Sequence, residues 1–272
     1  MFINKIMKIY FSPTHSTKKV VHAIAKGFRI NEQRTIDLNS LEQRHNFKFS
    51  IQPDEVVILG IPVYEERIPD LLFPGLCKIR GKGQPMILVV TYGNISAGIA
   101  LKQLNKMMCN QDFKIIAAAS FIGEHAFSQA ETKIASGRPD TRDLEKAELF
   151  GKQILQKIGS IEEIKNIPGL DIKGELRAMG KLLPKHSEIL FTHAPTVDPK
   201  LCQHCRKCLE LCPVNAIDPE NLRSRDRLCI RCFACVKLCP YNARKIIYKK
   251  PLLVKTVLKQ LGKKRKDPEI YI

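Results

Sequence analysis

Short apolar runs alternate with longer amphipathic stretches between Lys5 and about residue 160. Five segments have the length and pattern of strands and lie at 6–11, 34–38, 55–61, 86–91 and 114–121. Several are almost continuously apolar, which is typical of parallel strands covered on both faces. Three amphipathic stretches have helical spacing and lie at 17–30, 99–109 and 141–158. The alternation predicts an α/β domain over 1–160 with a doubly wound, parallel five-stranded sheet, since a barrel would need eight repeats.

The pattern changes after residue 160. Residues 161–199 have no clean period and carry several prolines, so we expect a connecting segment with one short helix near 175–183. From residue 200 to 248 the chain repeats itself, because 202–217 returns as 229–244. This internal duplication predicts pseudo-two-fold symmetry. Residues 249–272 predict an amphipathic helix at 251–261 and then a basic, solvated tail.

Eight of the ten cysteines lie between Cys202 and Cys239. They form the spacing C-x2-C-x2-C-x3-C-P twice, which is the spacing of two [4Fe-4S] clusters, with the fourth cysteine of each run serving the other cluster. One cluster would take Cys202, Cys205, Cys208 and Cys239, and the other Cys229, Cys232, Cys235 and Cys212. Zinc is the alternative, but zinc ribbons need neither the third and fourth cysteines nor the proline. The segment resembles the small α+β domain of bacterial two-cluster ferredoxins.

The loop Ser12-Pro13-Thr14-His15-Ser16-Thr17 follows the first predicted strand and opens a helix. Hydroxyl groups and unpaired backbone N–H groups at a helix start form an anion site. No G-x-G-x-x-G or G-x-x-x-x-G-K-[ST] motif occurs, so a dinucleotide or triphosphate is not indicated. The alternative is an ordinary capped turn.

Two further loops follow predicted strands, Gly60-Ile61-Pro62-Val63-Tyr64 after the third and Thr91-Tyr92-Gly93-Asn94 after the fourth. All three loops should meet at the carboxyl ends of the strands, where such sheets bind ligands. Together they resemble the flavodoxin family. A flavodoxin-like domain followed by eight cysteines resembles the flavodoxin–ferredoxin fusion proteins of anaerobes.

The resemblance implies FMN. Its phosphate would lie on Ser12, Thr14, Ser16 and Thr17, and its ring between Pro62, Val63 and Tyr64 on one side and Thr91, Tyr92, Gly93 and Asn94 on the other. His15 stands where these loops often carry glycine, so its side chain would either obstruct the phosphate or add a donor. For both tyrosines the alternative is plain packing.

A few other residues are candidates for lesser roles. His125 follows the fifth predicted strand and could supply a proton, although a hydrogen-bonded loop histidine is the simpler interpretation. Arg138 and Asp140 predict a local ion pair with a capping role before the last helix of the domain. Cys77 and Cys109 lie in or after apolar stretches and are expected in the core.

Charge and hydropathy complete the prediction. The formal net charge is +18, and the part from Lys181 onward contributes 20 basic against 8 acidic residues. A basic surface around the clusters predicts acidic redox partners. We find no signal-peptide pattern and no apolar run long enough for a membrane span, so we expect a soluble, cytoplasmic protein.

These features predict an iron–sulfur flavoprotein that transfers electrons between FMN and two [4Fe-4S] clusters, as a redox partner or reductase in anaerobic metabolism. The first alternative is a flavin-free ferredoxin-type carrier whose N-terminal domain only docks partners. The second is a cluster-based redox sensor, although the chain lacks a helix-turn-helix or a stacking-aromatic motif, which makes nucleic acid an unlikely partner.

Overall fold

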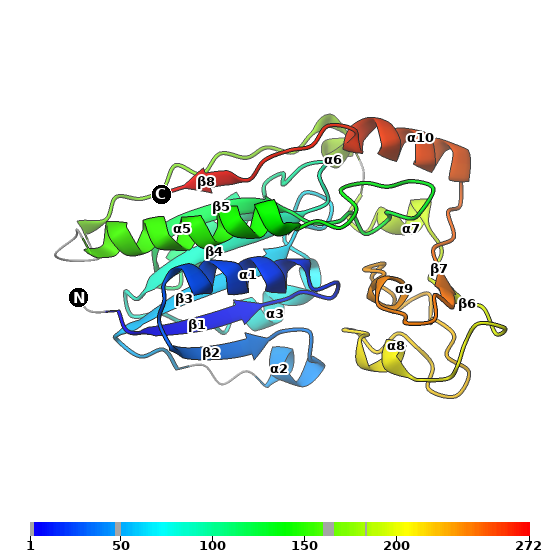
Figure 1. Ribbon diagram of the computed structural model, residues 1–272, viewed down its shortest axis with the longest axis horizontal. Helices are drawn as coiled ribbons and strands as arrows, with labels where there is room; N and C mark the ends of the chain where they lie inside the picture. The colour runs from blue at the N-terminus through cyan, green and yellow to red at the C-terminus, as the bar shows by residue number, and fades with distance from the viewer. Residues whose placement is uncertain (1–2, 47–49, 160–165, 183) are drawn as a thin grey trace.

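The N-terminal part of the chain is a three-layer α/β domain. The computed structural model describes residues 3–46, 50–159, 166–182 and 184–272. The sheet has the order β2-β1-β3-β4-β5-β8, and its first five strands are parallel. They are β1 (Lys5–Tyr10), β2 (Glu32–Asp37), β3 (Glu55–Pro62), β4 (Pro85–Tyr92) and β5 (Lys114–Ile122). The order 2-1-3-4-5 is that of flavodoxin-like sheets, which confirms the predicted fold class (Figure 1).

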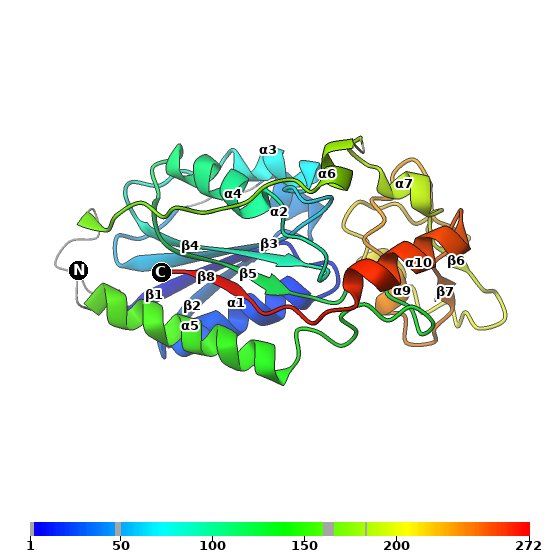
Figure 2. The ribbon, with the colours of Figure 1, turned by 90° about the horizontal axis from the view of Figure 1, so that it is seen from above.

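Helices cover both faces of this sheet. Helices α1 (Ser16–Gly27) and α5 (Thr141–Gly159) pack on one face, and α3 (Phe73–Leu76) and α4 (Ala100–Cys109) lie on the other (Figure 2). Each face has its own apolar core, because β3 and β4 alternate their buried side chains between the two sides. Helices α1 and α5 approach closely at Gly27 and Gly151, where an added Cβ would collide with the opposite backbone.

The two isolated cysteines do not lie in these cores. Cys77 and Cys109 are both exposed, so the prediction that they are core residues is wrong. Cys77 follows the end of α3, and Cys109 is the last residue of α4. In α4 the preceding residue, Met108, takes the buried position, and the next residue on a helix is turned by about 100° away from it.

Several short elements escaped prediction. Helix α2 (Leu41–His45) begins after Ser40, whose side chain accepts a hydrogen bond from the Gln43 amide. The 3-10 turn η1 (Asp70–Leu72) leads into α3. The expected helix near 175–183 is α6 (Ala178–Leu182), while residues 160–165 and 183 of the predicted connecting segment lie outside the described residues.

The C-terminal part is a small duplicated module. Strand β6 (Thr196–Val197) pairs with β7 (Arg244–Lys245), and each half has one short helix, α8 (Lys207–Glu210) or α9 (Ala234–Lys237). Strand β6 falls within the predicted connecting segment. Residues in the left-handed region recur 27 positions apart, with φ values of 50° and 53° at His204 and Arg231, 58° and 56° at Arg206 and Phe233, and 49° at both Asn215 and Asn242. The repeated backbone supports the predicted pseudo-symmetry.

The module packs against the carboxyl ends of the sheet strands through an apolar joint (Figure 1). Phe127, in the loop after β5, meets the Phe233 ring edge-on at 5.5 Å and lies 6.5 Å from the Tyr248 ring. The Tyr248 hydroxyl also donates a hydrogen bond of 2.6 Å to the Phe127 carbonyl. Helix α10 (Pro251–Gly262) adds Val254 and Leu258 to the same cluster, and Phe191 of α7 (Glu188–Phe191) packs against it. The two parts of the chain therefore share a core.

After α10 the chain returns to the first domain. Residues 263–268 run along it to β8 (Glu269–Tyr271), which pairs antiparallel with β5 at residues 118–120. The segment is largely exposed, as predicted for a solvated tail, but it is bonded to the first domain and is not free. We call it the C-terminal strap (262–271). The Asn94 amide donates to the carbonyls of Gly262 and Lys264 at 3.0 and 2.8 Å, and its carbonyl accepts from the Lys266 amide. The sixth strand was hidden in the sequence because it is only three residues long.

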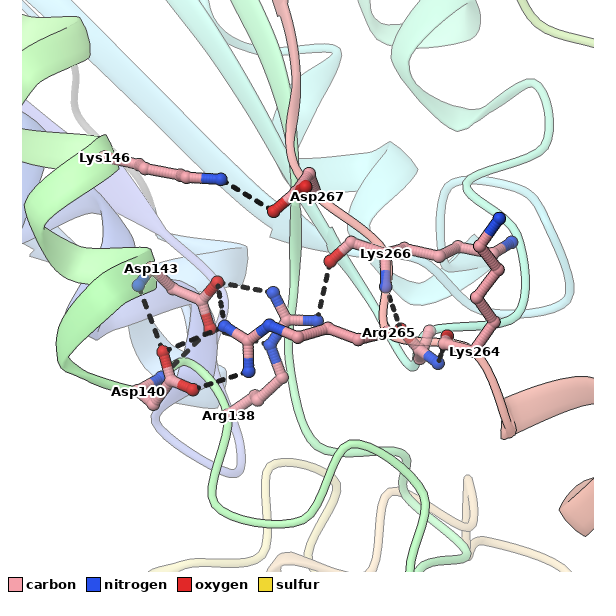
Figure 3. Close-up of polar contacts among 9 residues, drawn as sticks. Arg138, Asp140, Asp143, Lys146, Lys264, Arg265, Lys266 and Asp267 are labelled. Carbon is pink, nitrogen blue, oxygen red and sulfur yellow. Dashed lines mark hydrogen bonds and ion pairs between the residues drawn. The ribbon is translucent and has the colours of Figure 1, made fainter.

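A buried ion pair holds the strap at its centre (Figure 3). Arg138 and Asp143 are 6% and 1% exposed, and Arg138 Nε donates to Asp143 at 2.7 Å. The other end of the guanidinium donates to the Lys266 carbonyl at 2.9 Å. Asp140 accepts from the Asp143 amide at the start of α5, as its predicted capping role requires. Its ion-pair partner is Arg265 at 2.8 Å, so the expected pair with Arg138 is wrong.

We predict that Arg138→Ala lowers the free energy of unfolding by about 3–5 kcal/mol, because it leaves the Asp143 carboxylate buried without its main partner. Arg265→Ala is the matched control, since Arg265 is more exposed and contacts the same acidic pair. Its loss should cost about 1 kcal/mol or less. Anaerobic chemical denaturation of the full chain measures both. Equal losses for the two variants would contradict the role of the buried pair.

Candidate electron-transfer site

Cysteines from both halves of the duplication converge. Cys202 and Cys205, from the loop that leads into α8, and Cys208, within α8, line one small cavity. Cys239, which follows α9, lines it too. Cys235 also reaches this cavity. The first three residues come from one cysteine run and Cys239 from the other, which is the combination predicted for one cluster.

The remaining cysteines form a second group closer to the α/β domain. Burial raises the pKa of the Cys232 thiol, and the charges of Cys235, Cys229 and Cys212 raise it further. Cys212, from the other run, packs against the apolar cluster that contains Cys235. The Ala216 amide also donates a hydrogen bond of 3.2 Å to Cys212 Sγ. Bound iron would remove the thiol protons, because a coordinating thiol is deprotonated.

Each group includes cysteines of both runs, which is the pattern of ligation in two-cluster ferredoxins. In the described part of the chain, no three Cys, His, Asp or Glu side chains are grouped as ligands of one ion. In a cubane each thiolate binds a different iron, so its ligands are spread around a wider core. We propose that one cluster takes Cys202, Cys205, Cys208 and Cys239, and the other Cys229, Cys232, Cys235 and Cys212.

The two cysteine groups differ in exposure. Cys205 is exposed, and so are its neighbours Arg206 and Lys207. Cys235 is buried, and the pKa of the Tyr64 hydroxyl is raised by burial and by the charges of Cys232 and Cys229. Ile230, next to Cys229, packs with Tyr64 of the loop after β3 against the core of the α/β domain, so the second group lies beside that domain. The first group faces the solvent.

A cavity of about 490 Å³ lies between the second cysteine group and the α/β domain. One wall comes from loops that follow β3, β4 and β5 and includes Tyr64, Ile95 and His125. The opposite wall includes Ile230 and Arg231 of the cysteine loop, and apolar residues of α10 close it. This volume is in the range of ligand pockets, and the walls are mostly apolar with a few polar groups.

The polar groups of the cavity wall include a carboxyl pair. Glu65 accepts hydrogen bonds from the Ser187 hydroxyl at 2.6 Å and from the amides of His186 and Glu188 at 2.8 and 3.1 Å. These bonds lower the pKa of Glu65. Burial and the neighbouring Glu65 raise the pKa of Glu188 to about 7. Glu65 is therefore the member that carries the negative charge more readily, and Glu188 the one that holds a proton more readily.

His125 and Arg231 complete the wall. His125 Nδ1 accepts a hydrogen bond of 3.0 Å from the Phe127 amide, and burial lowers its pKa to about 4, with Lys237 contributing. Neutral His125 therefore carries its proton on Nε2. Arg231 is 2% exposed and pairs with Asp226 at 2.8 Å. Its Nε has no acceptor among the described residues.

The predicted phosphate loop leads into α1, but two of its four hydroxyl groups are hydrogen-bonded within the chain. His15 adopts φ 65° and ψ 0°, the conformation for which glycine is favoured, directly before α1. Ser12 Oγ accepts from the Lys18 amide at 3.0 Å, and the buried Thr17 hydroxyl bonds that of Thr91 at 2.6 Å. Thr14 and Ser16 are partly exposed and remain available to a ligand.

The predicted ring loops divide between two places. Val63 and Tyr64 line the cavity, whereas Pro62 is not among its lining residues. The loop of Thr91, Tyr92, Gly93 and Asn94 turns toward the strap, with Tyr92 only 6% exposed beneath Lys266 and Asn94 bonded to the strap. The next residue, Ile95, does line the cavity. An added Cβ at Gly123 would meet the Ser16 side chain, and one at Gly93 would meet His125. The phosphate loop thus lies beside the cavity without lining it.

Sequence reasoning missed the carboxyl pair, Arg231 and the strap. No local motif marks Glu65 and Glu188, because they are brought together by the packing of α7 on the loop after β3. Arg231 had a weak signal, since it lies inside a cysteine run where the other half has His204.

Comparisons with known proteins agree with the two-part organisation. Residues 194–241 match the family described as a 4Fe-4S dicluster domain. A search of curated proteins found no match. Similar solved structures include a flavodoxin from the domain Archaea, with 14% identity, coverage of 57% of this chain and 99% of that chain, and a TM-score of 0.37. Flavodoxin 1 from Bacillus cereus has 16% identity, coverage of 56% of this chain and 97% of that chain, and a TM-score of 0.39. Rubredoxin oxygen:oxidoreductase from Desulfovibrio gigas has 16% identity, coverage of 58% of this chain and 37% of that chain, and a TM-score of 0.41.

The chain therefore joins an α/β domain of flavodoxin-like strand order to a 4Fe-4S dicluster domain, as predicted. The assignment of the first domain rests on its strand order. No helix of the described residues is long and apolar enough to cross a membrane. An electron-transfer role follows from the cluster domain.

We predict about eight irons and eight sulfides per anaerobically loaded chain. Cys212→Ala should damage the cluster held by Cys229, Cys232 and Cys235, because the fourth ligand comes from the other run. Cys239→Ala is the matched variant and should damage the cluster held by Cys202, Cys205 and Cys208. Metal and sulfide analysis with EPR of the reduced protein distinguishes them. Two zinc ions without sulfide, or the reverse pattern of cluster loss, would contradict the assignment.

Proposed function

We propose that this chain is an iron–sulfur flavoprotein that passes electrons between FMN and two [4Fe-4S] clusters in anaerobic metabolism. One observation carries the proposal. The same cavity is lined by Tyr64 and His125 of the flavodoxin-like domain and by Ile230 and Arg231 of the second cysteine loop. A redox ligand in this cavity would contact the loop that carries Cys229 and Cys232, and only residues of that loop would separate it from the second cluster.

The two cysteine groups suggest a direction for the electrons. A partner would reach the exposed group around Cys205 first. The buried group around Cys235 would connect it to the cavity. Each cluster handles one electron at a time, whereas a flavin takes two. The chain would therefore link one-electron partners to two-electron chemistry.

The flavin-binding residues are part of this proposal. Thr14, Ser16 and the N–H groups at the start of α1 would hold the phosphate, because a helix N-terminus favours an anion. Val63 and Tyr64 would contact the ring at the cavity wall. When bound, FMN supplies reversible two-electron redox chemistry. Glu188, whose carboxyl holds a proton up to about pH 7, could deliver that proton to a ligand reduced in the cavity.

A flavin-free electron carrier is the second candidate, favoured by the strap. Asn94, which the resemblance assigns to the ring, instead bonds Gly262, Lys264 and Lys266. The Ser12 and Thr17 hydroxyls are also engaged within the chain. In this case the first domain would position the cluster domain and dock partners, and the cavity would serve another ligand.

FMN titration of the cluster-loaded protein separates these candidates. If the phosphate lies on α1, replacing both Thr14 and Ser16 with alanine removes two hydroxyl donors to a charged group, together worth about 3 kcal/mol or more. We expect FMN affinity to fall by roughly a hundredfold or more. Thr17→Val is the control and should have a smaller effect on affinity, because its hydroxyl bonds Thr91. No FMN binding by the parent chain would favour the carrier.

The exposed basic residues beside the first cysteine group point to an acidic partner. With a reduced acidic two-cluster ferredoxin as donor, the rate of electron delivery should fall as salt rises, because exposed charges are screened. Lys207→Glu should slow delivery several-fold at low salt. Lys102→Glu, an equal charge change on the exposed side of α4, is the control. Equal rates for the two variants would contradict a docking surface at the first cluster.

A further inference from the structure

The pseudo-symmetry of the cluster domain is broken at a position that is buried in both halves. After each C-P dipeptide the sequence continues x-Asn-Ala, and the next residue is Ile217 in the first half but Arg244 in the second. Both are buried, at 5% and 4% exposure. Ile217 packs in the apolar cluster that includes Cys235 and that Cys208 and Cys212 border, as an isoleucine should. Arg244 places a full positive charge at the equivalent point.

Arg244 lies between the two cysteine groups. Its Nη1 donates to Cys208 Sγ at 3.7 Å and to the Leu222 carbonyl at 2.8 Å. Its Nη2 donates to Ser224 Oγ at 2.5 Å and more weakly to the Pro195 carbonyl. Arg244 and Cys235 also line the same small cavity, and Cys235 belongs to the other group. One side chain therefore lies near a predicted ligand of each cluster.

The charge of Arg244 has no other counter-ion in the described part of the chain. None of the ion pairs found there includes Arg244, and its Nε has no hydrogen-bond acceptor. A buried, unpaired guanidinium is strongly unfavourable. The cysteine thiolates and the clusters they hold are the anions within its reach. This explains why an arginine is tolerated where the other half has isoleucine.

We propose that Arg244 is a tuning residue shared by both clusters, which raises their reduction potentials and allows both to hold an electron together. Reduction adds one electron, and so one negative charge, to a cluster that is already anionic. A nearby positive charge and N–H···S bonds stabilise this added charge, and hydrogen bonds and net charge are known determinants of cluster potential. The electron comes from the external redox partner, and no bond is made or broken.

The position of the guanidinium also predicts what its loss would do. Without it, the first added electron would repel the second with less compensation in the low-dielectric interior. Both midpoint potentials should fall, and the gap between them should widen. A planar arginine fork can bond Cys208, Leu222 and Ser224 at once, which a lysine ammonium on a flexible stem does less well.

The experiment is an anaerobic, EPR-monitored redox titration of the full cluster-loaded chain, with iron and sulfide measured on the same samples. Arg244→Ile makes the two halves alike, and Arg244→Gln removes the charge but keeps a donor. We expect both variants to shift the two midpoints downward, by at least a tenfold change in the reduction equilibrium, which is 59 mV for one electron. Arg244→Lys should recover part of the shift. Ile217→Val, equally buried and uncharged, should leave both potentials unchanged.

The outcomes separate this inference from the proposed function on which it rests. A parent chain without iron and sulfide would overturn the cluster assignment itself. Intact clusters with unchanged or raised potentials in the neutral variants would overturn the role of Arg244 alone. If Arg244→Ile fails to assemble its clusters, Arg244→Gln and Arg244→Lys still decide the question. A charge effect requires that the midpoint potentials of the lysine variant lie closer to those of the parent than the potentials of the glutamine variant do.

Discussion

The packing of Phe127 against Phe233 and Tyr248 is the contact on which the rest of the structure depends. It joins a loop of the α/β domain to the cluster domain through aromatic rings and a hydrogen bond to the Phe127 carbonyl. Burying such rings contributes about 1.5–3 kcal/mol each, and the aromatic pairing adds to this. Together with the bonds of Lys237 to Glu124 and Ser128, this joint fixes the position of the second cysteine group relative to the cavity.

The joint also explains why only one of the two cysteine groups faces the α/β domain. The loop around Cys229 to Cys235 faces the α/β domain because Phe233 within it is the residue that docks. Lys237 strengthens the same side by donating to the Ser128 carbonyl at 2.5 Å and pairing with Glu124. The first group, around Cys205, is left at the surface. The two cysteine groups of the nearly symmetric duplication therefore differ in position, one beside the α/β domain and the other at the surface.

The sequence predicted those features that depend on local spacing. The strands of the parallel sheet were visible because runs such as the one in β4 are buried on both faces and so are apolar throughout. The cysteine runs were visible because cluster ligation demands a strict spacing. Strand β8 was not visible, since Glu269, Ile270 and Tyr271 have no run of apolar residues around them and pair only because the strap brings them to β5. The cavity depends on how the two parts pack, which no local pattern encodes. Arg244 could be noticed in the sequence, because this charged residue stands where the other half of the duplication has Ile217.

The pairing of β8 with β5 changes how the cluster domain relates to the sheet. Because the sheet contains strands from before and after residues 194–241, the cluster domain is topologically an insertion in the α/β fold rather than an appendage. It is tethered at both ends, so its effective concentration at the cavity stays high even if the aromatic joint opens for a moment. A singly linked domain would diffuse away on its linker and search for its place again. Here the two tethers limit how far the domain could move, so any opening would end in the same register.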